Sequence, residues 1–96
     1  IDEKSIDVEK QTTYILCKFD KANRTFLFNQ EQDIFSESIG IEEYKFNNIK
    51  YSSTHIYGMS GNEEILINRV SGEISSTINN DRPKLGMCEL LKSRKF

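Results

Sequence analysis

The 96-residue chain is poor in several residue types that carry recognisable chemistry: it has one histidine, two cysteines, one proline and no tryptophan. A single histidine, without any Cys-x-x-Cys pair, argues against a zinc site. No apolar run approaches the roughly 18 residues that a membrane-spanning helix needs. The net charge is −2, whereas nucleic-acid-binding domains carry a basic patch. We therefore expect no metal or other cofactor, no nucleic-acid partner and no membrane span.

The composition predicts one small domain. Only 36% of the residues are hydrophobic and 29% are charged, so the core is small, although six phenylalanines and four tyrosines add large apolar areas. Residues 1–11 are charged and weakly patterned, which predicts a flexible or late-added leader. Residues 12–96 are expected to form a single β domain.

The clearest predicted element is a β-hairpin over residues 64–78. Apolar and β-branched residues at 65–67 and 74–78 flank a connection that contains Gly72. A glycine there can take the positive φ that a type I turn with a following bulge requires. This hairpin is the element around which the rest of the fold is predicted.

Other segments rich in β-branched and aromatic residues alternate with polar turns. The segment 34–46 fits either two short strands bent at Gly40 or a short helix near 31–39. Short strands separated by frequent turns indicate an all-β fold, a small antiparallel β-sandwich or barrel of about seven to eight strands. The remaining predicted strands cover residues 12–19, 25–29, 49–59 and 85–91.

Two further turns are predicted from local composition. Asn47-Asn48 has the residue type that favours chain reversal. Gly58 and Gly61 bracket a predicted loop that leads into the hairpin.

Cys17 and Cys88 lie near opposite ends of the predicted β domain, each in an apolar, strand-like segment. They can form a disulfide, be two buried free thiols, or include a reactive cysteine, and we favour the disulfide. A bridge across so long a loop contributes roughly 4 kcal/mol in the chain-entropy description. It also implies an oxidising compartment, periplasmic or extracellular. The start at Ile1, without an apolar signal-peptide core, fits a signal peptide that has already been removed.

The sequence predicts no catalytic site, and we expect a protein that is not an enzyme. His55 is the only side chain whose ordinary pKa lies near neutrality, and no Gly-x-Ser-x-Gly motif accompanies it. The adjacent glutamates at 42–43 and at 63–64 point to opposite faces of a strand, so neither pair forms a dyad locally. No phosphate-binding loop or calcium loop is present.

One strand carries aromatic and methionine side chains that suit an interface. Tyr51, His55, Tyr57 and Met59 share one side of the segment 49–59 if that strand runs straight. This side is either a core face or a contact surface for a protein partner. We expect an exported domain that binds another macromolecule as an inhibitor, immunity or envelope accessory protein. The alternatives are a small-molecule or glycan-binding barrel, and a structural or virulence-associated module.

The segments Tyr14-Ile15-Leu16-Cys17 and Phe26-Leu27-Phe28-Asn29, with Ser53 and Tyr57, are similar in spacing to the bacterial periplasmic inhibitors of C-type lysozyme, over about half the chain. The resemblance implies a small antiparallel barrel with one cysteine in the first strand and another near the C-terminus. The chain departs from the family at Ser53-Thr54, where the family has Ser-Gly, and at Ser71-Gly72, where it has Lys-Gly. The family's tryptophan strand has no counterpart, and no inhibitory residue is carried over.

Overall fold

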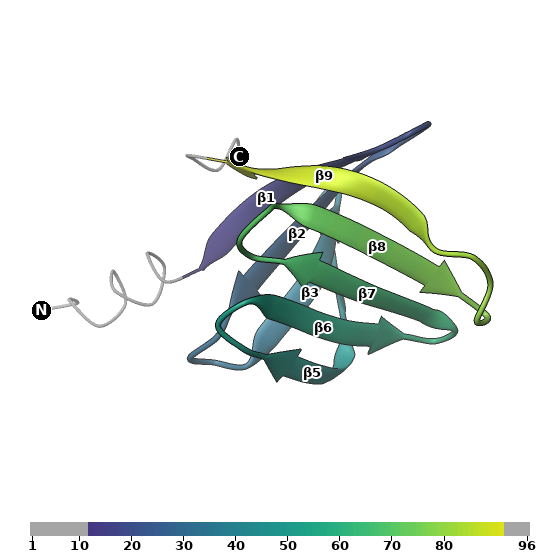
Figure 1. The fold of residues 1–96 in the computed structure, drawn as a ribbon. Coiled ribbons are helices and arrows are strands. Elements are labelled where there is room, and N and C mark those ends of the chain that lie inside the picture. The colour runs from purple at the N-terminus through teal and green to yellow at the C-terminus, as the bar shows by residue number, and fades with distance from the viewer. Residues whose placement is uncertain (1–11, 92–96) are drawn as a thin grey trace, which may run out of the picture.

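The computed structural model describes residues 12–91, and every regular element in that range is a β-strand (Figure 1). The predicted leader 1–11 and residues 92–96 lie outside the described residues. The described part of the chain has no helix long and apolar enough to cross a membrane. The strands are β1 (Thr13–Phe19), β2 (Asn23–Asn29), β3 (Ile34–Ile39), β4 (Glu42–Lys45), β5 (Asn47–Tyr51), β6 (His55–Ser60), β7 (Glu63–Asn68), β8 (Glu73–Ile78) and β9 (Lys84–Leu91).

All strands belong to one antiparallel sheet with the order β4-β3-β2-β1-β9-β8-β7-β6-β5. Each strand pairs with its neighbour in sequence except at the β1–β9 contact, where the first strand meets the last (purple and yellow in Figure 1). The outer strands β4 and β5 are separated only by Phe46, so they are two halves of one bent strand. Because β4 pairs with β3 and β5 with β6, the sheet forms a nearly closed barrel.

The all-β prediction is confirmed, with nine strands instead of seven to eight. The segment predicted as one strand over 49–59 is two strands, because residues 52–54 form a turn between β5 and β6. The ambiguous segment 34–46 contains β3 and β4, so the strand interpretation is right and the helix near 31–39 is absent. Gly40 makes the tight turn between them with a φ of +62°.

The turn predicted at Asn47-Asn48 is wrong, since both residues belong to β5. Asn48 has a φ of +52°, and the β5–β6 register shifts between Asn47 and Lys50. Asparagine tolerates this left-handed conformation, which here produces a β-bulge instead of a chain reversal.

The predicted hairpin is present as β7 and β8. Gly72 closes the connection with a φ of +85°, and its amide donates to the carbonyl of Asn68 at 2.8 Å. The side-chain oxygen of Asn68 accepts hydrogen bonds from the amides of Val70 and Ser71. The turn therefore fixes the register in which Ile67 lies opposite Ile74.

The barrel interior is filled by an aromatic cluster surrounded by isoleucines. Phe35 and Phe46 have ring centroids 4.6 Å apart, and Phe26 contacts both rings at 5.9 and 6.1 Å. Gly58 lies within β6 and faces this cluster, which corrects the loop predicted there. A Cβ atom at Gly58 would lie 2.6 Å from the Phe35 ring, so only glycine leaves room for it. The buried isoleucines are Ile15, Ile56, Ile65, Ile67 and Ile74.

We expect Gly58→Ala to lower the free energy of unfolding by about 1–3 kcal/mol, because the added methyl group overpacks the aromatic cluster. Urea denaturation followed by circular dichroism measures this change. Ser75→Ala, on the outer face of β8, is the control and should stay within about 0.5 kcal/mol of wild type. Equal stabilities of the two variants would contradict this account of Gly58.

Cys17 and Cys88 lie directly opposite each other on β1 and β9 and form a disulfide that spans 71 residues of sequence. The disulfide prediction is confirmed, and neither cysteine is free. Cys17 is fully buried within the core. The bridge therefore lies at the contact that joins the two ends of the chain, and it is compatible with an oxidising compartment.

We expect removal of the disulfide to cost roughly 4 kcal/mol, because the reduced unfolded chain regains the freedom of a long loop. Urea denaturation with and without a reductant gives this value for wild type. The double variant Cys17→Ala/Cys88→Ala should be insensitive to the reductant. A wild-type midpoint that does not move on verified reduction would contradict this expectation.

Candidate functional site

The side chains predicted to form an interface separate into two groups. Ile56 and Gly58 are buried, so His55, Tyr57 and Met59 point to the outer face of β6. Tyr51 instead belongs to β5, and its ring packs inside the barrel with its centroid 6.5 Å from that of Phe28. The four residues do not share one side, because the turn at 52–54 breaks the strand between them.

The outer face of β6–β9 carries a row of side chains that are opposite one another in the sheet register. Tyr57 pairs with Leu66, Leu66 with Ser75, and Ser75 with Leu85. We refer to these four residues as the outer row. Leu66 is 41% exposed and Leu85 is 71% exposed, and Met87, the next outward residue on β9, is 52% exposed. The row is thus an exposed apolar strip across four rigid strands.

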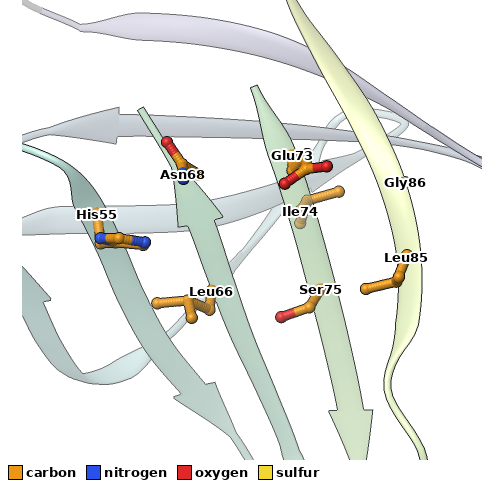
Figure 2. Close-up of a pocket in the computed structure, with 8 residues that line it drawn as sticks. All are labelled: His55, Leu66, Asn68, Glu73, Ile74, Ser75, Leu85 and Gly86. Atoms are coloured by element: carbon orange, nitrogen blue, oxygen red, sulfur yellow. The ribbon is translucent and has the colours of Figure 1, made fainter. Parts of the chain in front are cut away.

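A shallow groove of about 190 Å³ crosses this face. Ser75 has a small side chain and lies between Leu66 and Leu85 in the sheet register, so a depression remains between the two leucines (Figure 2). The volume is below the roughly 300–1,000 Å³ of small-molecule sites, and it suits one or two side chains of a partner. The lining residues are His55, Leu66, Asn68, Glu73, Ile74, Ser75, Leu85 and Gly86.

Carboxylates stand at the margin of the apolar strip. Glu64 lies opposite Met59, and Glu73 lies opposite Met87 and lines the groove. Desolvation, together with the neighbouring Glu64, raises the pKa of Tyr57. Within residues 12–91 neither Glu64 nor Glu73 takes part in an ion pair. The face therefore combines an apolar centre with carboxylates that form no ion pair among the described residues, and the Lys50 ammonium lies 5.9 Å from the ring centroid of Tyr57.

His55 lies at the groove, where it is one of the lining residues. Its Nδ1 lies 2.9 Å from the hydroxyl of Thr54. Glu73 also lines the groove (Figure 2), but no hydrogen bond or ion pair joins it to His55 within the part of the chain described. No group of three or more His, Cys, Asp or Glu side chains among residues 12–91 is placed to hold a metal ion.

A second polar cluster lies near the barrel end that carries the β1–β2, β3–β4, β6–β7 and β8–β9 turns. Arg24 donates to both carboxylate oxygens of Glu37 at 2.9 and 2.8 Å, and to both of Glu63 at 2.7 and 3.2 Å. Ser76 donates to Glu63 at 2.6 Å. The guanidinium also lies 5.2 Å from the ring centroid of Phe26. This cluster links β2, β3, β7 and β8.

The charges of this cluster are largely satisfied by one another. Partial burial by itself would raise the pKa of Glu63, but hydrogen bonds from Arg24 and Ser76, and the charges of Arg24 and Lys84, outweigh it and lower that pKa. The hydrogen bond to Glu37 leads the effects that raise the pKa of Arg24. Glu63 is thus ionised at neutral pH and cannot act as a general acid there. The geometry supports a structural role for the cluster.

We expect Arg24→Met to lower the free energy of unfolding by about 3 kcal/mol, because Glu37 and Glu63 lose the guanidinium that both of them bind. This value is the lower end of the range for breaking a buried pair, since the three side chains keep 14–23% exposure. The pH profile should also reverse. The lowered pKa of Glu63 gives wild type stability that is present above about pH 4.3 and is lost as the pH falls further.

In Arg24→Met, burial and the nearby Glu37 charge should raise the pKa of Glu63, so the variant should gain stability as the pH falls from about 7 to 5. Urea denaturation at a series of pH values tests both profiles. Arg82→Met, in the exposed β8–β9 loop, is the matched control and should keep the wild-type profile. Parallel profiles for Arg24→Met and wild type would rule out this charge coupling.

The sequence pattern held a signal for part of the outer row. Leu66 is the middle residue of the run Ile65-Leu66-Ile67, and strand alternation requires it to face away from its neighbours. By the same alternation, Leu85 and Met87 face outward and Gly86 faces the opposite side of β9. The Arg24 cluster had no such signal, because its members lie 13 and 39 residues apart.

Comparison of the chain with protein-family models, with curated proteins and with solved structures finds no significant match. The resemblance to the periplasmic inhibitors of C-type lysozyme therefore rests on residue spacing alone. The barrel-like sheet agrees with the fold that this resemblance implies.

Proposed function

We propose that this domain acts by binding another protein through the outer face of β6–β9, as an inhibitor, immunity or envelope accessory protein. The observation that carries the proposal is the exposure of Leu66, Leu85 and Met87 on one face of the sheet, with the small Ser75 between Leu66 and Leu85. Contiguous exposed apolar side chains mark interaction sites in soluble proteins. Because the strands are already ordered, little conformational entropy is lost when a partner binds.

The same face favours a partner of particular chemistry. Its groove accepts an apolar side chain, while the carboxylates of Glu64 and Glu73 favour lysine or arginine beside it. Tyr57 and Met59 add contact area of the kinds enriched in protein interfaces. We therefore infer a protein partner with an apolar anchor flanked by basic residues.

The disulfide also supports a proposal for the compartment. A bridge between Cys17 and Cys88 supports a periplasmic or extracellular location, since such bonds persist in oxidising surroundings. The partner is accordingly sought in the envelope or the medium.

The double variant Leu66→Lys/Leu85→Lys tests this face, because it replaces the apolar centre by two cations that also repel a basic partner. Immobilised wild type and variant are exposed to envelope extract, and a protein that wild type retains is purified for titration. We expect the variant to bind that protein at least about 30-fold more weakly, the threshold for an interface hot spot.

Ile41→Lys is the matched control, because it replaces a fully exposed isoleucine in the β3–β4 turn, away from the outer row. It should bind like wild type, and urea denaturation should show all three proteins equally folded. Wild-type affinity in the double variant, or loss of binding only in Ile41→Lys, would refute the proposed surface.

A further inference from the structure

A larger cavity opens at the barrel end opposite the Arg24 cluster. The β8–β9 pairing stops at Glu73 and Met87, but β9 continues to Leu91 with β1 as its partner. The connection over residues 69–72 is tied to β9 by the Cys88 amide, which donates to the carbonyl of Gly72 at 2.7 Å. A cavity of about 340 Å³ lies between this connection and the end of β9.

The floor of the cavity and part of its rim are apolar, while Asn68, Ser71 and Glu89 add polar groups to the lining. Ile15, Phe28, Ile56 and Ile67 line it from inside the barrel, and all four belong to the core or pack against it. At the rim, Val70 is 78% exposed and Leu90 is 70% exposed. Ile15, Ile56 and Ile67 are almost fully buried, whereas Phe28 is only partly buried. Phe28, Val70 and Leu90 therefore form the apolar surface that is open to solvent. An apolar ligand would bury these three side chains together.

The cation Arg69 lines this cavity and forms no ion pair within residues 12–91, although Glu89 also lines it. The Arg69 guanidinium lies 5.9 Å from the ring centroid of Phe28. Its Nη1 donates to the side-chain oxygen of Gln30 at 3.1 Å and to the carbonyl of Ser52 at 2.7 Å, both neutral acceptors. Glu89 pairs with Lys18 instead. Among the described residues the guanidinium thus has only neutral hydrogen-bond acceptors, which leaves its charge available to an anion.

We propose that this cavity binds a small amphipathic carboxylate, with its aliphatic chain against Phe28, Val70 and Leu90 and its carboxylate on Arg69. The volume lies at the low end of ligand pockets, which favours a short chain over a long lipid. An arginine binds a carboxylate through two parallel hydrogen bonds, and this geometry selects it over an alcohol or an amine. The site shares no residue with the outer row.

Titration of the ¹⁵N-labelled protein with octanoate, followed by amide chemical shifts, tests the site. We expect saturable shifts at residues 69–72 and 88–90, and none centred on the outer row. Octanoate should bind more tightly than octanol, and octylamine should bind more weakly than both. Affinity should rise about fourfold for each methylene between hexanoate and octanoate.

Arg69→Gln should bind octanoate and octanol equally, because the charge is lost while a hydrogen-bonding side chain remains. Arg82→Gln, at the opposite barrel end, is the matched control and should behave like wild type. Leu90→Asp, at an exposed position, keeps the fold and should abolish octanoate binding by repulsion.

Three results would overturn the proposal: no saturable shifts in wild type, shifts that map elsewhere, or an unchanged octanoate preference in a folded Arg69→Gln. Leu66→Lys/Leu85→Lys should retain octanoate binding, so failure of this site and failure of the protein-binding face are distinguishable.

Discussion

The contact between β1 and β9 is the constraint on which the rest of the structure depends. All other strand pairings join neighbours in the chain and can form through short turns. The β1–β9 pairing must bring together segments about seventy residues apart, and the entropy of closing that loop opposes it. The disulfide supplies this closure covalently. Both proposed binding sites include residues of β9. They therefore form only after β9 has paired with β1 and the barrel has closed.

The two arginines near the barrel ends show how environment separates a structural role from a binding role. Arg24 has both neighbouring carboxylates bound, so its charge is used within the fold. Arg69 joins the β2–β3 and β5–β6 turns through neutral oxygens, so it holds those turns while its charge remains available. Arginine therefore stabilises the fold at one barrel end and provides a charged group for the proposed ligand at the other.

Local patterns predicted most of the fold, and contacts between distant residues account for what they missed. The β-branched runs around Gly72 specified a hairpin, because turn and strands agree within fifteen residues. Gly58 looked like a loop residue because its reason for being glycine is the Phe35 ring, which is distant in sequence. Asn48 adopts the left-handed backbone conformation that asparagine tolerates. That conformation occurs both in β-bulges and in chain reversals, and the sequence did not distinguish the two. Strand alternation correctly placed His55, Tyr57 and Met59 on one face of β6. It wrongly added Tyr51, because the turn at 52–54 separates Tyr51 from that strand.

The bent strand made of β4 and β5 has a consequence for how the barrel moves. Within the described residues each half pairs along one edge only, and every residue of β4 is exposed. Little apolar area becomes exposed to solvent when β4 separates from β3. The β3–β4 pairing is therefore where the barrel opens at the lowest free energy. Amide hydrogens of β4 should therefore exchange with solvent through local fraying, whereas those beside the disulfide wait for global unfolding. An unpaired strand edge of this kind also accepts an added strand. The edges of β4 and β5 are therefore where two copies of the chain could exchange strands.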